Sequence, residues 1–289
     1  MRLPILLAAA ALASAGCAAP SYVGQTGRVT PRHAFRGSVG AGYQLSTGAA
    51  SVVKDGRDLA KTLNDKRRAC PDLSAAACWD AADVEPVVDA AYRFALAAPL
   101  SASTEVGLRY GFASGFDAGL RWGPAVKGLD VGWQLHGPRD ASDGWAGTVL
   151  LGWSSRKLGA LGTAIEDVFQ GDASLTDYAL TYVTGFEYRE IAHVYLGGRF
   201  LASRWKAQII PDIPIVYDGG EVQARLLGTD ASGALAHWGG FGGVALGYKR
   251  VWIGAELSLL WTSGSARIMF EDRSVSGLGV MPSVFLYAQ

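Results

Sequence analysis

The sequence lacks any apolar run long enough to cross a bilayer as a helix. A membrane-spanning helix needs about 18 or more consecutive apolar residues, and no segment after the N-terminal region approaches that length, although 49% of the chain is hydrophobic. Excess charge of either sign is also missing, since 26 basic residues balance 26 acidic ones. These absences exclude a helical membrane protein and argue against a nucleic acid partner.

Cysteine is scarce, with three residues in the whole chain. Cys17 follows a basic Arg2, an apolar stretch over residues 3–12 and several small residues, which is the layout of a secretory signal. Two cleavage sites remain open. Ala-Ser-Ala at 13–15 fits ordinary signal peptidase, whereas Ala-Gly-Cys at 15–17 resembles a bacterial lipobox, in which Ser14 replaces the usual leucine.

The other two cysteines favour the lipobox. Cys70 and Cys78 are eight residues apart and can pair as a small disulfide loop in an exported protein. Cys17 would then be an odd free thiol unless it carries lipid. We therefore expect a signal peptide over 1–16, a periplasmic linker over 17–33 that begins at a lipid-modified Cys17, and one large domain over 34–289.

Alternation of apolar and polar residues dominates that domain. A transmembrane strand places every second side chain toward lipid over about 9–11 residues. Ten segments of the chain show this pattern, and they predict an all-β fold, a transmembrane antiparallel up-and-down barrel of ten strands, with eight or twelve as alternatives. The segments are 35–45, 104–112, 116–122, 129–136, 145–153, 177–188, 192–203, 236–249, 251–262 and 278–287.

Aromatic residues at the ends of these segments distinguish a membrane barrel from a soluble sandwich, because alternation alone fits both. Trp145 and Trp153 are eight residues apart, and Trp238 and Tyr248 are ten apart. At about 3.3 Å per residue and a tilt near 40°, these separations span roughly 20–25 Å along the membrane normal, which matches two aromatic girdles. The spacing favours the bacterial outer membrane, with lipid as the surrounding partner.

The lengths of the connections support ten strands. Tight connections at 113–115, 189–190 and 249–250, with a somewhat longer one at 137–143, would face the periplasm together with both chain ends. Long connections at 46–99, 155–174, 207–234 and 264–275 would lie outside, and a short outer turn near Pro124 is the exception. The 46–99 connection predicts a helical extracellular insertion. It is either a cap on the barrel mouth or a recognition module for a protein partner. A shorter helix is predicted over 156–170.

The inward-facing positions carry nearly equal numbers of acidic and basic groups. Because a ten-stranded barrel is narrow, and because buried charges are tolerated when paired, we expect a cross-linked and largely plugged lumen; a narrow channel is the alternative. The predicted polar network consists of Arg36, Glu105, Arg109, Asp117, Arg121, Asp130, His136, Asp177, Glu187, His193, Arg199, His237 and Glu256.

Catalytic and metal-binding patterns are not evident. No aspartate lies two residues from any histidine, and no Cys/His cluster has the spacing of metal ligands. His136, His193 and His237 are predicted to face inward as packing or hydrogen-bonding residues. A hydrolase is the least favoured hypothesis, and no cofactor or metal is expected.

The segment from Glu105 to Gly111, followed by Phe116 to Gly123, resembles a hairpin common in small bacterial outer-membrane barrels. With the lipobox-like start, the chain is similar to the outer-membrane β-barrel lipoproteins, a loosely defined class. The resemblance concerns architecture over residues 34–289, and the aromatic residues Phe285 and Tyr287 fit a C-terminal assembly strand. These motifs are not specific to a function. The balanced charges of the lumen beside the 46–99 insertion favour a structural anchor or a surface-presentation protein, with a narrow solute channel as the alternative; the sequence does not indicate a ligand or an oligomeric state.

Overall fold

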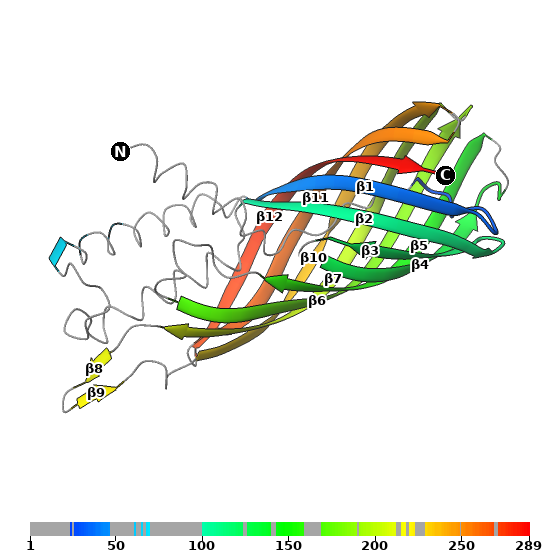
Figure 1. Ribbon diagram of the computed structural model, residues 1–289. Coiled ribbons are helices and arrows are strands. Elements are labelled where there is room, and N and C mark those ends of the chain that lie inside the picture. Colours follow the sequence, from blue (N-terminus) through cyan, green and yellow to red (C-terminus); the bar gives the residue numbers. More distant parts are fainter. Residues whose placement is uncertain are drawn as a thin grey trace.

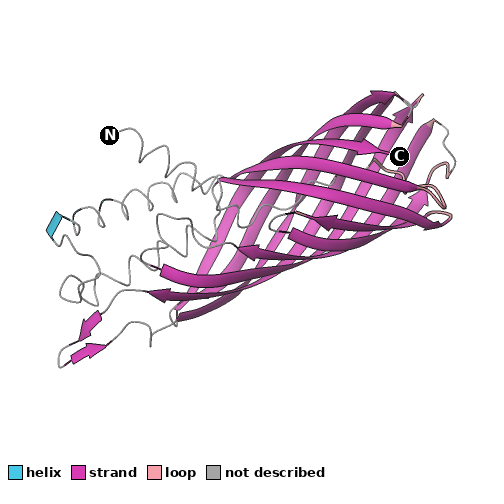
Figure 2. Cartoon of the chain, viewed as in Figure 1, coloured by secondary structure: helices cyan, strands magenta, loops and turns pink. Residues whose placement is uncertain are grey.

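The computed structural model describes residues 24, 26–46, 61, 65, 68–69, 100–123, 126–139, 143–158, 169–189, 191–211, 215–217, 220–222, 229–248, 250–268 and 271–289. Ten long strands form one closed antiparallel barrel, in the order β1-β12-β11-β10-β7-β6-β5-β4-β3-β2. Two short strands, β8 (Ile215–Tyr217) and β9 (Gly220–Val222), pair as a separate hairpin. No helix among the described residues is long and apolar enough to span a bilayer. Figure 2 shows how completely strands make up the barrel wall.

Neighbouring strands in the chain are neighbours in the barrel, apart from the β8–β9 hairpin, and the first strand closes on the last. This is the up-and-down topology predicted from the ten alternating segments. The strands are β1 (Phe35–Ser46), β2 (Leu100–Ala113), β3 (Phe116–Trp122), β4 (Val126–His136), β5 (Gly144–Leu158), β6 (Phe169–Tyr188), β7 (Ala192–Pro211), β10 (Thr229–Tyr248), β11 (Val251–Ile268) and β12 (Glu271–Ala288).

The outer wall is apolar because alternate residues of each strand point away from the lumen. On β5, for example, Leu151 is 61% exposed while its neighbour Leu150 is 8% exposed. A water-soluble protein would bury such a surface, and a transmembrane barrel presents it to hydrocarbon. The exposed large apolar side chains include most of those predicted to face lipid, so the assignment of faces is confirmed.

A row of large outward side chains, which we call the bulky row, crosses five strands of the outer wall and lies at the edge of the apolar band. The register aligns Leu180 with Phe200, Phe200 with Trp238, Trp238 with Trp261, and Trp261 with Leu278. The next outward row away from the short turns contains Tyr178, Ala202, Ala236, Ser263 and Ser276. The outer surface therefore changes from large apolar groups to small and hydroxyl-bearing groups within one row. This change marks one boundary of the hydrocarbon layer.

The two ends of the barrel differ in shape. At one end, which we call the short-turn end, tight connections join β2 to β3, β4 to β5, β6 to β7 and β10 to β11, and the barrel strands β1 and β12 begin and end there. At the opposite end, the long-connection end, the rim is uneven, because β3 has 7 residues and β6, β7 and β10 have 20 each. Figure 1 shows β6 and β7 extending well past β3 and β4.

The long strands extend beyond the membrane. At about 3.3 Å per residue and a tilt near 40°, 20 residues cover about 50 Å, roughly twice the height of an apolar band. The predicted helix over 156–170 is wrong at its ends, since residues up to Leu158 continue β5 and residues from Phe169 form β6. The predicted helical insertion over 46–99 falls almost entirely outside the described residues and receives no support from them. Cys17, Cys70 and Cys78 also lie outside them.

Candidate functional site: the polar lumen and the segment inside it

Residues 24 and 26–34, which we call the lumen segment, run through the barrel interior to its mouth, where Arg32 and His33 are exposed. Residues 26 to 30 are buried, and the segment reaches the short-turn end at Ala34, where β1 begins. His33 makes the turn into the strand with a positive φ of 64°. The expectation of a periplasmic linker over residues 17–33 is therefore corrected for this part of the chain, which occupies the lumen.

The deep half of the lumen segment is bound by carboxylates of the wall. The backbone N–H of Gly24 donates to Glu256 Oε2 at 3.0 Å. Thr26 Oγ1 donates to Glu187 Oε1 at 3.0 Å, and the Arg28 guanidinium forms an ion pair with Glu187 Oε2, also at 3.0 Å. Because polar groups inside a barrel have little access to bulk water, these wall carboxylates provide hydrogen-bond and ionic partners for the segment.

The half of the lumen segment nearer the short turns is bound by β2 and β3. The Thr30 N–H donates to Asp117 Oδ2 at 2.8 Å. The His33 N–H donates to the Gly111 carbonyl at 2.7 Å, and the Gly111 N–H donates to the Ala34 carbonyl at 3.1 Å. The segment therefore adds backbone hydrogen bonds to the inner face of the wall.

Two glycines allow the backbone of this segment to touch the wall. A Cβ placed on Gly111 of β2 would collide with the carbonyl oxygens of Pro31 and Thr30. A Cβ on Gly27 of the segment would collide with the Ala146 carbonyl. Both contacts are with backbone atoms, which a side-chain movement cannot relieve, so a side chain at either position would push the segment away from the wall.

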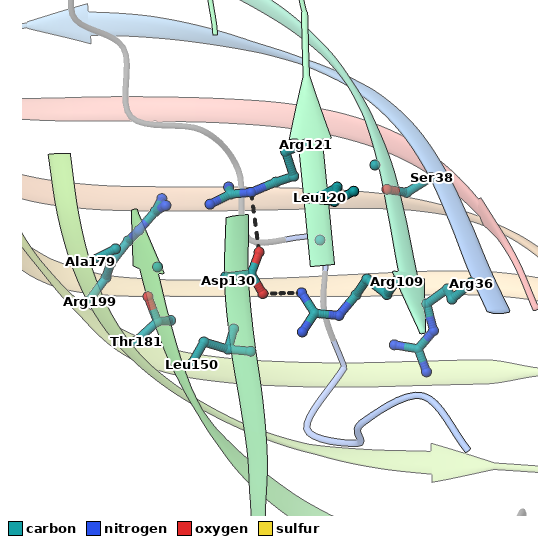
Figure 3. A pocket seen from close by; sticks show the side chains of 13 residues that line it. Arg36, Ser38, Arg109, Leu120, Arg121, Asp130, Leu150, Ala179, Thr181 and Arg199 are labelled. Atoms are coloured by element: carbon teal, nitrogen blue, oxygen red, sulfur yellow. Dashed lines mark hydrogen bonds and ion pairs between the residues drawn. The ribbon is translucent and has the colours of Figure 1, made fainter. Parts of the chain in front are cut away.

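Arg109 is the centre of the ion-pair network on the β2–β4 side. Its guanidinium pairs with Asp117 Oδ1 at 2.5 Å and with Asp130. Arg121 lies 3.5 Å from Asp130 Oδ2 and 4.0 Å from Glu105 Oε2. Figure 3 shows Asp130 between Arg109 and Arg121. Asp117 also accepts from Thr30, so this network binds both the wall and the lumen segment.

A second buried network lies nearer the long-connection end. Arg156 pairs with Asp177 Oδ2 at 2.8 Å, and the hydroxyls of Ser154 and Ser203 donate to the two oxygens of Asp177 at 3.1 and 2.5 Å. Asp177 is 1% exposed. Each oxygen of this carboxylate has a hydroxyl donor and one has a cation, which is the arrangement that makes a buried charge tolerable.

The side of the lumen formed by β7, β11 and β12 contains a cluster of stacked aromatic rings. Trp252 and Tyr287 stack with ring centroids 5.0 Å apart, and the His193 ring stacks on Trp252 at 5.3 Å. Tyr195 donates to Glu256 Oε2 at 3.0 Å. The alternation in the sequence places Tyr195, Phe241 and Tyr287 on the inward face, but the predicted lumen network included only charged residues and histidines. The buried apolar cluster consists of Leu150, Val183, Tyr195, Phe241, Ala245, Trp252, Phe285 and Tyr287.

A cavity of about 50 Å³ remains in the lumen, beside Gly24. This space can hold a few water molecules. Figure 3 shows the side chains around it, with Arg121 and Arg199 extending toward the same region. Its lining comprises Gly24, Arg36, Ser38, Gly107, Arg109, Leu120, Arg121, Asp130, Leu150, Gly152, Ala179, Thr181 and Arg199.

His136 departs from the predicted network. A β-bulge between Gln134 and His136 shifts the register against β5, so Leu135 and His136 are both exposed. The His136 ring then lies 3.1 Å from the hydroxyl of Tyr182 on the outer wall. The other predicted members lie on the lumen side of the wall: Arg36, Glu105, Arg109, Asp117, Arg121, Asp130, Asp177, Glu187, His193, Arg199, His237 and Glu256.

The lumen histidines are engaged in hydrogen bonds. His193 Nδ1 is bonded to the Tyr287 hydroxyl, and His237 Nδ1 lies 2.7 Å from Thr262 Oγ1. Among the described residues, no group of three or more His, Cys, Asp and Glu side chains is placed to hold a metal ion.

Comparison with known proteins gives structural matches of low similarity. No family model matches the sequence, and no curated protein matches it significantly. Neisserial surface protein A aligns with 8% identity and a TM-score of 0.33, over 88% of this chain and 96% of its own. Ail, the attachment invasion locus protein of Yersinia pestis, aligns with 10% identity and a TM-score of 0.26, over 87% and 97% of the two chains. The CymD monoaromatic hydrocarbon channel aligns with 7% identity and a TM-score of 0.26, over 89% of each chain.

The class of protein follows from the structure. A closed antiparallel barrel with an even number of strands, an apolar outer band with aromatic edges, tight turns at one end and a polar interior is the architecture of outer-membrane barrels. The chain is a ten-stranded transmembrane β-barrel of the bacterial outer membrane.

Proposed function

We propose that this protein is a closed outer-membrane barrel that serves as a structural anchor and presents its long-connection end to partners, rather than an open pore. The observation that carries the proposal is the lumen segment, whose residues 26–30 are buried within the barrel and bound to Asp117, Gln134 and Glu187. A solute pathway would need an unobstructed lumen with a selective constriction. Here the lumen beside the segment holds paired ions and stacked rings.

Conductance in planar bilayers tests this proposal. The purified full-length barrel, inserted at known protein density, is expected to give no reproducible open level. A defined conductance step that scales with protein amount would contradict the proposal and favour the alternative, a narrow channel for small solutes. Heat-modifiability on a gel, measured on the same sample, verifies that a silent preparation contains folded barrel.

The proposed orientation places the short-turn end in the periplasm, because outer-membrane barrels have short periplasmic turns and longer outer loops. Both the start of β1 and the C-terminus at Gln289 would then be periplasmic. An epitope inserted between Ser114 and Gly115, in the tight β2–β3 turn, is expected to be inaccessible to antibody in intact cells and accessible after permeabilisation. Labelling in intact cells would reverse the orientation.

We also propose that Cys17 is acylated, on the lipobox-like Ala-Gly-Cys sequence at 15–17 and the odd number of cysteines. Palmitate labelling of the wild type should be lost in Cys17→Ala, whereas Cys70→Ala should retain it. A wild type that takes up no palmitate would favour ordinary signal cleavage, and labelling that persists in Cys17→Ala would place the lipid on another residue.

No catalytic role is proposed for the lumen histidines. His193 and His237 are held by Tyr287 and Thr262, as expected of packing and hydrogen-bonding residues. Substituting His136, His193 and His237 one at a time should leave lipid A structure and surface peptide profiles unchanged. A change in either profile would support the hydrolase alternative.

A further inference from the structure

An open groove crosses the outside of the barrel just above the bulky row of Phe200, Trp238 and Trp261. Two consecutive outward rows form it, and both consist mostly of small residues. The first row aligns Tyr178, Ala202, Ala236, Ser263 and Ser276, and the second aligns Thr176, Arg204, Ala234, Ser265 and Ser274. The step from tryptophan and phenylalanine to alanine and serine creates the depression.

The groove combines a cation with several hydroxyl groups. Arg204 is exposed in the second row, and Lys206 is the next outward residue of β7. Facing Arg204 across the small alanines are Ser265 and Ser274 on β11 and β12. Among the described residues that line the groove, none is a carboxylate. A guanidinium in such a setting presents a forked pair of donors that fits the oxygens of a phosphate.

The depth of the groove in the membrane favours a lipid phosphate over a free phosphate ion. Aromatic belts of barrels mark the boundary between acyl chains and headgroups, and the groove lies one to two rows beyond this belt. At about 3.3 Å per residue along a tilted strand, these rows lie about 5–10 Å past the belt, where lipid phosphates are found. A free anion would have no reason to select this level, whereas a lipid would place acyl chains against Phe200, Trp238 and Trp261 below.

We propose that this groove binds the phosphorylated headgroup of a lipid in the leaflet at the long-connection end, with Arg204 and Lys206 as the phosphate ligands and the serine hydroxyls as additional donors. The identity of that leaflet as the outer one rests on the orientation under the proposed function. The phosphate site itself does not depend on that orientation or on whether the lumen is closed. Failure of the site and failure of the anchor hypothesis are therefore distinguishable.

Native mass spectrometry of the detergent-solubilised, full-length barrel tests the site, with diphosphoryl lipid A as the probe. Wild type is expected to retain one lipid A per barrel, and Arg204→Gln combined with Lys206→Gln should weaken binding about tenfold or more, the usual effect of removing charge-assisted hydrogen bonds. Lys127→Gln is the matched control, because Lys127 is an exposed outward cation paired with Trp122 on the short β3–β4 side, away from the groove.

Two further binding measurements identify whether the phosphate belongs to a lipid or is a free ion. Dephosphorylated lipid A should bind as weakly to the wild type as diphosphoryl lipid A binds to the double variant. Inorganic phosphate at millimolar concentration should not displace the lipid if acyl chains contribute to binding. Equal retention by wild type and double variant, equal binding of both lipids, or displacement by inorganic phosphate would each overturn the proposal. Heat-modifiability verifies that the variants are folded, which their exposed positions lead us to expect.

Discussion

The proposal of a closed lumen is tested most directly by displacing the lumen segment without changing any charged residue. Gly111→Val is expected to do this. The added side chain would project from β2 into the space occupied by the Pro31 and Thr30 carbonyls. Backbone atoms cannot rotate out of the way, so either the strand or the segment must move. The strand is hydrogen-bonded on both edges, to β1 and β3, and the segment is therefore the part expected to leave.

The magnitude follows from the bonds that the displaced segment loses. Two neutral backbone bonds, from His33 to Gly111 and from Gly111 to Ala34, contribute about 1 kcal/mol each, and the charge-assisted bond from Thr30 to Asp117 contributes about 2 kcal/mol. A loss of about 4 kcal/mol changes the ratio of docked to undocked segment by about a thousandfold. A segment that is docked almost all of the time would become undocked in a large fraction of molecules.

Two measurements detect this change. Bilayer recordings of Gly111→Val should show conductance that the wild type lacks, and trypsin should cleave after Arg28, which is 6% exposed in the closed barrel. Gly37→Ala is the matched control, since a Cβ at Gly37 would meet no atom within 4 Å. A Gly111→Val barrel that remains heat-modifiable, silent and protected at Arg28 would refute the assignment of this segment as the element that closes the lumen.

Asp177→Asn should lower the free energy of unfolding by about 3–5 kcal/mol, because the variant removes the buried ion pair between Asp177 and Arg156. Urea denaturation in lipid measures this loss, and Asp143→Asn at the exposed β4–β5 turn should cost less than 1 kcal/mol. A similar loss in both variants would contradict the network. Val244→Arg, on the outward face of β10 between its aromatic ends, should cost about 2–4 kcal/mol, whereas Ser265→Arg, beyond the bulky row, should cost about 0–1 kcal/mol. Equal costs in this pair would place the hydrocarbon boundary elsewhere.

Much of the fold could be predicted because a barrel repeats one simple pattern. Along β3, for instance, the sequence alternates Phe116, Ala118, Leu120 and Trp122 with Asp117, Gly119 and Arg121, and the predicted strand 116–122 has the observed bounds. Such alternation is visible wherever one face meets lipid and the other meets the polar lumen. It therefore supplied the strand number, the direction of most side chains in the predicted segments and the closure of the first strand on the last.

The alternation failed as a signal where the outward face of a strand does not meet lipid, and where a strand is irregular. Beyond the bulky row the outward residues are small and polar, as at Ser263 and Ser265, so the alternation fades while the strand continues. The strands were consequently predicted too short, by eight residues at the start of β6. At His136 a β-bulge interrupts the period of two, and the side chain turns outward. A bulge has no strong signature in a single sequence.

The lumen segment could not be predicted for a different reason. Its sequence, Thr-Gly-Arg-Val-Thr at 26–30, has no alternation and no apolar run, and such a stretch next to a signal sequence resembles an ordinary linker. The partners that hold it are distant in sequence, with 161 positions between Thr26 and Glu187. Only the closed barrel brings them together. The balance of charges inside the barrel was a usable signal, but it was attributed to the wall alone.

The balance of acidic and basic groups inside the barrel depends on the lumen segment. The acidic residues on the described lumen wall outnumber the arginines by one, and Arg28 of the segment supplies the missing cation through Glu187. Three wall carboxylates, on Asp117, Glu187 and Glu256, each accept a bond from the segment, and Asp117 and Glu256 also accept one from the wall, from Arg109 and Tyr195. The segment is therefore part of the packed interior in the same sense as a core side chain, and without it each of these three carboxylates would lose a partner, including the ion pair of Glu187 with Arg28. The groups compared are Glu105, Asp117, Asp130, Asp177, Glu187 and Glu256 against Arg36, Arg109, Arg121, Arg156 and Arg199.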